Sequence, residues 1–250
     1  MGRIIFLPRP PQRIVSLVPS QTELLHDLGL DASVVGITKF CIHPPEWRRS
    51  KQVIGGTKNF QLDIIERLNP DLIIGNKEEN AKEAIGVISK RYPIWMSDIF
   101  NLDDAIGMIK AIAQITDKSE AGAIIAHDII AKFHDLKKVT VKSVLYLIWR
   151  EPFMAVGKNT FIDAMLGCIG LQNVVTQNRY PVITLDEIKN LEPHYVFLSS
   201  EPYPFKDVHR HELQNALPTS KVILVDGEMF SWYGSRLLKA PDYFRTLELD

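Results

Sequence analysis

The chain has 250 residues, a hydrophobic share of 46%, a charged share of 24% and a formal net charge of −1 at pH 7. This length allows one large domain or two small ones, and the composition is typical of a globular protein. The near-zero charge and the lack of a long basic segment argue against a nucleic-acid partner. Cys41 and Cys168 are the only cysteines, which indicates neither a disulfide framework nor a zinc motif, although one bridge in an oxidising compartment stays open.

The N-terminal segment has a short apolar patch from Ile4 to Leu7, followed by Pro8, Pro10 and Pro11. A secretory signal requires about 7–15 uninterrupted apolar residues, and a membrane-spanning helix requires about 20. We therefore expect the chain as written to be soluble and to carry no export signal.

The first elements follow a strand–helix order. Residues 13–18 are typical of a buried strand, and Ser20 and Glu23 have the spacing of a capping box at the start of a helix. Gly29 stands where helices commonly end. The same alternation of strands and helices continues along the chain and predicts an α/β fold with largely parallel sheets.

A thirteen-residue pattern occurs twice. The segment 62–74 recurs as 185–197 without gaps, and in both copies a short helix, a proline and an apolar strand follow one another. Upstream, Leu28-Gly29-Leu30 is echoed by Ile169-Gly170-Leu171. We interpret this as two similar lobes, while chance likeness between ordinary α/β segments stays the alternative.

Two helical segments lie between the repeats. The apolar residues of 102–113 and of 120–136 keep a helical period, and 116–119 interrupts it. Because no Gly- or Pro-rich linker is present, the second helix is expected to join the lobes stiffly. The predicted division is an N-terminal lobe at 1–116, a bridging helix at 117–138 and a C-terminal lobe at 139–250. A crossover helix within one large sheet is the alternative.

Aromatic residues are concentrated in the segments that follow the predicted strands. In parallel α/β sheets, ligands bind beyond the carboxyl ends of the strands. Three of the four tryptophans, Trp47, Trp149 and Trp232, fall in such segments. Together they favour the wall of a cleft for a large, partly apolar ligand, although each one is equally suited to covering the core.

Enzyme motifs are lacking. The segment 157–160 resembles the end of a phosphate-binding loop, but Pro152 stands where that loop requires glycine. Cys41 and His43 form at most a weak metal or thiol motif, and 209–211 is typical of a solvated face. We predict no catalytic residues, no metal site and no resident cofactor.

The chain resembles the ABC-transporter substrate-binding proteins with a helical backbone, the family of cobalamin, siderophore and haem receptors, and is most similar to its cobalamin-binding members. The resemblance rests on 13–24, 35–37, 44–45, 53–55 and 62–75 in the first half, and on 156–161 and 166–175 in the second. It implies two α/β lobes with parallel sheets, bridged by one long rigid helix, with the ligand in a cleft between the lobes.

The resemblance also implies a function and a set of site residues. The expected function is the binding of a corrinoid or another metal chelate for delivery to an ABC-transporter permease, by a monomer. The expected location is the periplasm or cell envelope, but without a signal in this chain a cytoplasmic location is not excluded. Ligand contacts are expected at Phe40, Cys41, Trp47, Trp149, Arg150, Phe153, Tyr180, Phe230, Trp232 and Tyr233, and permease docking at Glu78, Glu79, Glu201 and Glu212.

Two alternatives stay open from the sequence. The first is a ferric-siderophore or haem receptor on the same fold. The second is a cytoplasmic protein that handles a metal or a corrinoid through Cys41, His43 and the acidic pair Glu78 and Glu79.

Overall fold

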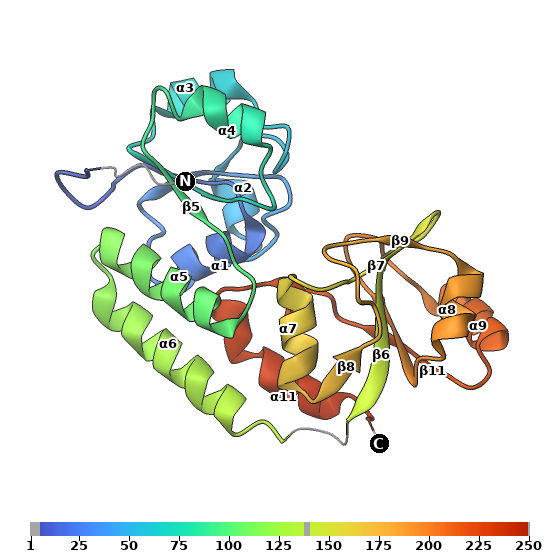
Figure 1. The fold of residues 1–250 in the computed structure, drawn as a ribbon. Coiled ribbons are helices and arrows are strands. Elements are labelled where there is room, and N and C mark those ends of the chain that lie inside the picture. The colour runs from blue at the N-terminus through green and yellow to red at the C-terminus, as the bar shows by residue number, and fades with distance from the viewer. Residues whose placement is uncertain (1–5, 138–140, 250) are drawn as a thin grey trace. The chain divides into compact units, whose positions relative to one another are not determined.

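The computed structural model describes residues 6–137 and 141–249, which divide into two compact units. Unit 1 consists of 6–99, Asp103–Ile129 and Trp232–Leu238, and unit 2 consists of the remaining described residues. Each unit has its own sheet. Figure 1 shows the elements in chain order, which are β1 (Ile14–Ser16), α1 (Pro19–Asp27), β2 (Val34–Ile37), α2 (Trp47–Ser50), β3 (Gln52–Val53), α3 (Leu62–Leu68), β4 (Leu72–Asn76), α4 (Lys82–Ile88), β5 (Ile94–Ser97), α5 (Leu102–Ile115), α6 (Ser119–His134), β6 (Lys142–Trp149), β7 (Phe153–Ala155), α7 (Phe161–Cys168), β8 (Leu171–Asn173), β9 (Val182–Ile183), α8 (Leu185–Leu191), β10 (Tyr195–Ser199), α9 (Asp207–Ala216), β11 (Lys221–Val225), α10 (Glu228–Ser231), η1 (Ser235–Leu238) and α11 (Ala240–Thr246).

The sheet of unit 1 is parallel throughout, in the order β3-β2-β1-β4-β5. The sheet of unit 2 is mixed. Its parallel part has the order β8-β6-β10-β11, while β7 and β9 pair antiparallel beside β6. The prediction of parallel sheets is therefore confirmed for unit 1 and needs correction for β7 and β9 of unit 2.

The repeat detected in the sequence is a structural repeat. The strands β2-β1-β4-β5 of unit 1 and β8-β6-β10-β11 of unit 2 have the same order and direction. Both α3 and α8 end at a left-handed residue, Asn69 with φ 42° and Glu192 with φ 44°. A left-handed residue ends a helix and redirects the chain, so the same step leads into β4 and into β10.

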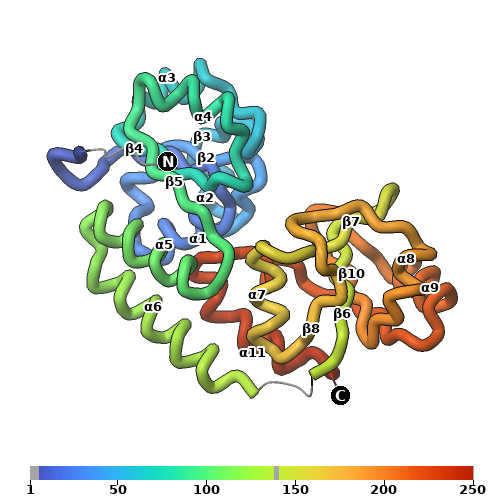
Figure 2. Tube along the Cα trace, in the orientation of Figure 1, coloured from blue at the N-terminus to red at the C-terminus, as the bar shows by residue number. Residues whose placement is uncertain are grey.

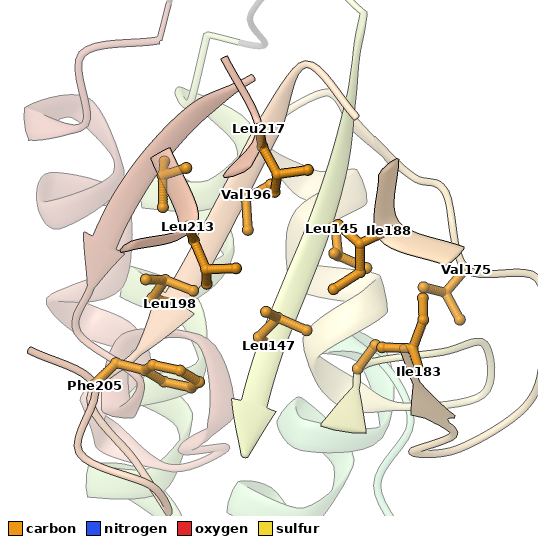
Figure 3. Packing of buried hydrophobic residues seen from close by; sticks show 12 residues of the cluster. Leu145, Leu147, Val175, Ile183, Ile188, Val196, Leu198, Phe205, Leu213 and Leu217 are labelled. Carbon is orange, nitrogen blue, oxygen red and sulfur yellow. The ribbon is translucent and has the colours of Figure 1, made fainter. Parts of the chain in front are cut away.

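The core of unit 2 follows the alternation of its strands. Leu145 and Leu147 of β6 pack with Ile188 of α8 and Leu213 of α9 on one face, as Figure 3 shows. Tyr146, which lies between them in sequence, contacts Phe230 on the other face at a ring-centroid distance of 5.3 Å. Successive side chains of a strand point to opposite faces, so both faces of this sheet are covered.

The two central helices form a hairpin, visible in Figures 1 and 2 as α5 and α6 lying side by side. The predicted break between them is confirmed at 116–118, where Asp117 is left-handed with φ 58°. The division between the units falls within α6, at 129–130. None of the described helices is long and apolar enough to cross a membrane.

The C-terminal part of the chain departs from the predicted division. Trp232–Leu238 belongs to unit 1, although it was predicted within the C-terminal lobe. The chain therefore passes between the units here as well as through α6, so the bridging helix is not the sole connection. Gly234 lies directly on α1, where a Cβ atom would stand 2.6 Å from the Ser20 carbonyl oxygen.

A buried ion pair holds this segment on α1. Arg236 Nε donates to Glu23 Oε2 at 2.9 Å, and both side chains are 7% exposed. The predicted capping box at Ser20 and Glu23 is wrong, because α1 begins at Pro19 after Val18 and no side chain caps it. Glu23 instead pairs with a residue that is more than two hundred positions away in the sequence.

Removal of one partner is expected to be costly, because a buried charge without its counter-ion is strongly destabilising. We predict that Arg236→Met lowers the free energy of unfolding by about 3 kcal/mol in urea denaturation. The double variant Glu23→Leu/Arg236→Met removes both charges and is expected to lose less. An equal or larger loss in the double variant would contradict this account.

Candidate ligand-binding site

The carboxyl end of β1 is lined by a buried polar network. Thr22 Oγ1 lies 2.8 Å from Ser16 Oγ and 3.0 Å from Cys41 Sγ, and Thr38 Oγ1 lies 3.2 Å from the same sulfur. Cys41 is fully buried, and this burial raises the pKa of its thiol. Cys41 was predicted as a ligand contact, and the structure places it in the core instead.

Phe40, one residue earlier, has the opposite environment. Its side chain is 50% exposed, and Lys39 Nζ lies 5.0 Å from the ring centroid. The backbone below it is fixed, because Lys39 N donates to Gly55 O at 2.8 Å and Cys41 N donates to Thr38 O at 3.1 Å. The loop after β2 therefore presents an aromatic face and a cation to solvent from a rigid turn.

Trp47 is also a core residue. Its indole is 1% exposed and meets His26 edge-on at 5.4 Å, with Lys51 Nζ at 5.2 Å from the ring. Because α2 lies against the end of α1, Trp47 fills unit 1, which corrects its prediction as a ligand contact.

The predicted docking residues of unit 1 lie on a tightly bonded loop after β4. Asn76 Oδ1 accepts from the backbone N–H of Glu78 at 2.8 Å and of Glu79 at 3.2 Å. Asn80 Oδ1 in turn accepts from Asn76 N at 2.9 Å. The charge of Glu79 is one of the causes that raise the pKa of the Cys41 thiol.

Trp232 and Tyr233 belong to the crossing segment on unit 1, and each is 6% exposed. Trp232 meets His43 edge-on at 5.5 Å, and the Arg236 guanidinium lies 5.0 Å from its ring. Both aromatic residues are thus largely enclosed, and their ligand contacts stay predictions.

In unit 2, Trp149 stands at the end of β6 and is 40% exposed. The Tyr203 ring meets the Trp149 indole edge-on, with 5.7 Å between the ring centroids. The Tyr203 hydroxyl oxygen lies 3.3 Å from His209 Nε2. His209 Nδ1 accepts from Lys206 N at 3.0 Å, which leaves the proton on Nε2 to donate to Tyr203. Trp149 is thus the exposed end of a supported aromatic cluster.

Arg150 follows Trp149 and is held by α9. Its Nη2 donates to both carboxylate oxygens of Glu212, at 2.9 and 2.8 Å. Arg150 was predicted as a ligand contact and Glu212 as a permease contact, whereas the structure joins them in one ion pair. Glu201, the other predicted docking residue of unit 2, accepts from Ser231 Oγ at 2.5 Å.

Phe230 is a core residue of unit 2. It is fully buried and contacts Tyr146, Phe197 and Phe244, the last at a ring-centroid distance of 4.7 Å. Its prediction as a ligand contact is corrected, because α10 points this ring into the unit. Phe153 packs partly against the opposite side of the same sheet.

Tyr180 lies half-buried on a loop that is anchored by the segment resembling a phosphate-binding loop. Gly157 N donates to Arg179 O at 2.7 Å, and Arg179 N donates to Lys158 O at 2.8 Å. A Cβ atom on Gly157 would clash with the Gln177 carbonyl oxygen. This segment therefore serves to fix the loop, with the Arg179 guanidinium 5.6 Å from the Tyr180 ring.

The predicted contacts thus separate into two groups. Phe40, Trp149, Arg150, Phe153 and Tyr180 are exposed or partly exposed, while Cys41, Trp47, Phe230, Trp232 and Tyr233 are buried. Sequence reasoning missed Lys39, Tyr203 and His209. Tyr203 could have been predicted as a site residue from its place in the aromatic loop after β10. His209 could not, because the sequence 209–211 is typical of a solvated face.

Two hollows in the described part of the chain are lined by other residues. One of about 260 Å³ in unit 2 is lined by 174–177, 181–183, Glu187, Asn190 and Leu191. Binding pockets for drug-sized ligands have about 300–1,000 Å³, so this hollow is small for a macrocyclic metal chelate. The described residues hold no group of three or more His, Cys, Asp or Glu side chains able to bind a metal ion.

Known proteins resemble the chain over most of its length. The vitamin B12-binding protein of Pectobacterium carotovorum is 23% identical over 240 residues, covering 92% of this chain and 86% of that protein. An uncharacterized ABC transporter substrate-binding lipoprotein of Bacillus subtilis is 25% identical, covering 94% of this chain and 79% of the lipoprotein. The heme-binding protein RhuT from Roseiflexus sp. RS-1 superposes with a TM-score of 0.79 at 21% identity, covering 93% of this chain and 97% of RhuT.

The likeness to RhuT shows the fold, a two-lobed α/β architecture. The family described as periplasmic binding protein matches residues 14–223, which include the repeat and every described strand except the last two residues of β11. The chain belongs to the family of periplasmic binding proteins.

Proposed function

We propose that this chain is the substrate-binding component of an ABC importer and that its ligand is a corrinoid. The family consists of binding proteins, and relatives of similar length are named vitamin B12-binding proteins and a substrate-binding lipoprotein of an ABC transporter. The proposed role is to bind the corrinoid and present it to a permease.

The observation that carries this proposal is the exposure of large aromatic side chains on fixed supports. Phe40 and Trp149 are 50% and 40% exposed; Phe40 follows β2 of unit 1, and Trp149 is the last residue of β6 of unit 2. An exposed aromatic face gains free energy when an apolar ligand surface covers it, about 25 cal/mol per Å². Because the turn below Phe40 and the cluster behind Trp149 are bonded in place, little conformational entropy is lost on binding.

A corrinoid offers both surfaces that these residues complement. Its macrocycle has extended apolar faces, and its rim carries amide groups that accept and donate hydrogen bonds. Phe40 and Trp149 suit the faces, and the guanidinium of Arg150 suits a carbonyl oxygen of the rim. The predicted position of the ligand between the two lobes stays a prediction.

Permease docking is proposed for Glu78 or Glu79 of unit 1 and for Glu201 of unit 2. The bonded Asn76 turn fixes where the first two carboxylates emerge. Charge pairs at the rim of an interface set orientation and association rate more than affinity.

The direct test is a calorimetric and tryptophan-fluorescence titration with cyanocobalamin, dicyanocobinamide and haemin. Saturable one-to-one binding of cyanocobalamin, tighter than that of haemin, supports the corrinoid assignment. Tighter binding of haemin would overturn that assignment and favour the haem alternative. Absence of binding by all three ligands would overturn the proposal.

Trp149→Ala should weaken cyanocobalamin binding by about 1–3 kcal/mol, because the exposed indole loses its apolar contact with the ligand. The thermal unfolding midpoint should change little, since Trp149 stands at the outer end of its cluster. Val208→Ala on α9 is the matched control, because Val208 is 64% exposed and apolar but lies outside the proposed site. If both variants changed the affinity equally, Trp149 would not be a ligand contact.

Cys41 allows a test of the alternative in which a reactive thiol handles the metal. Burial raises the pKa of the Cys41 thiol, so the folded chain disfavours the thiolate that reacts with iodoacetamide. We expect peptide mapping to find Cys41 unmodified in the native protein at pH 8.5 and alkylated in guanidinium chloride. Cys41→Ser should still bind cyanocobalamin, and its failure to bind while folded would revive the alternative.

The same shift has a consequence for stability. A thiol whose pKa is higher in the folded than in the unfolded chain stabilises the fold below the unfolded pKa, and this contribution is lost as the pH rises above it. The free energy of unfolding of Cys41→Ser should therefore fall less between pH 7 and pH 10 than that of the wild-type protein. Urea denaturation at a series of pH values measures this difference. An identical pH profile in both proteins would contradict this assignment.

A further inference from the structure

Arg150 is a cation whose charge is already compensated. Its Nη2 donates to both oxygens of Glu212, and Glu151 Oε1 lies 3.6 Å from its Nε. Two carboxylates thus accompany one guanidinium at the turn between β6 and β7. The electrostatic environment that a ligand meets here is neutral to negative rather than positive.

The guanidinium nevertheless has donors to offer. It carries five N–H groups, and Nη2 alone is committed to Glu212. Glu151 stands beyond hydrogen-bond distance, and no hydrogen bond involves Nη1 within the described chain. Nη1 is not among the enclosed unsatisfied atoms, and the Arg150 side chain is 23% exposed. One edge of the guanidinium is therefore open to a hydrogen-bond acceptor.

The charge and the open donors together select the type of acceptor. A ligand carboxylate approaching Nη1 would be attracted by the guanidinium and repelled by the charges of Glu212 and Glu151. A neutral carbonyl oxygen would form the same hydrogen bond without that repulsion. Discrimination of this kind, through a repulsive element against the competing ligand, is a common basis of specificity.

We propose that Trp149 and Arg150 form a subsite for a neutral, amide-bearing edge of the ligand, and that Glu212 makes this subsite reject carboxylates. This inference rests on the proposed function and names its ligand class, a macrocycle with amide rather than acid substituents. Glu212 acts through Arg150, so it is a specificity-determining residue without touching the ligand. Its assignment replaces the predicted role in permease docking.

The test uses a matched pair of ligands, cyanocobalamin and its monocarboxylic acids, in which one propionamide has been hydrolysed to a carboxylate. Each of the isomeric acids is titrated separately, by calorimetry, at pH 7.5. The wild-type protein is expected to bind cyanocobalamin about tenfold more tightly than the isomer whose acid faces Arg150. The isomers whose acid group faces away from Arg150 serve as controls, because they show how much the loss of any one amide changes the affinity.

Glu212→Gln removes the repelling charge while keeping an oxygen for Arg150. In this variant, cyanocobalamin should bind at most about threefold more tightly than the isomer whose acid faces Arg150. The difference in affinity should shrink mainly because the acid binds more tightly. Asp207→Asn is the matched control, since it makes the same charge change on the same helix, where Asp207 pairs with Arg210 rather than Arg150. That variant should leave the ratio unchanged.

Arg150→Gln provides the second variant. It should weaken cyanocobalamin binding several-fold, because the donor edge is lost, while circular dichroism and thermal unfolding confirm that it folds. The proposal is overturned if Glu212→Gln keeps the wild-type ratio, if Asp207→Asn shifts the ratio equally, or if Arg150→Gln binds cyanocobalamin unchanged. Failure of the wild-type protein to bind cyanocobalamin would overturn the proposed function and the subsite with it.

Discussion

The direction of parallel strands is the constraint on which the candidate site depends. Parallel strands end at one edge of their sheet, so the segments that follow them are brought together there, although they are distant in the sequence. In unit 1 this places the loops after β1, β2 and β4 at one edge. In unit 2 it places the ends of β6, β10 and β11 together. Of the two exposed aromatic residues, Phe40 lies in the loop after β2, and Trp149 is the last residue of β6.

Within this frame, buried polar contacts decide which side chains face outward. The hydroxyl groups of Thr22 and Thr38 hold Cys41 inside unit 1, so the chain turns and Phe40 is left at the surface. In unit 2, Tyr203 packs against Trp149, and its hydroxyl group is hydrogen-bonded to His209. The exposed aromatic residues are therefore supported by polar side chains whose own hydrogen bonds are satisfied inside each unit.

Much of the fold was predictable, because it follows from local patterns. The repeat of 62–74 at 185–197 predicted two copies of one motif, and α3–β4 and α8–β10 occupy these segments. Long-range pairing was not predictable. Glu23 fits a capping box by spacing, yet it pairs with Arg236, and Arg150 pairs with Glu212. Local sequence carries no sign of either partner.

The site was predictable by region and only partly by residue. The loops after the strands were identified, but Cys41, Trp47 and Phe230 proved to be core residues. An aromatic residue that fills the core and one that faces a ligand have the same local sequence pattern, since the difference arises from the turn that carries them. The bonded neighbours of each ring, rather than its residue type, separate the two cases.

Hydrogen–deuterium exchange with and without cyanocobalamin tests most directly whether the ligand binds where the strands end. Cyanocobalamin bound at these strand ends should slow amide exchange in the loop 38–43 of unit 1 and in the turn 149–153 of unit 2. Unchanged exchange in both segments, with protection instead around the hollow lined by 174–177 and 181–183, would contradict it.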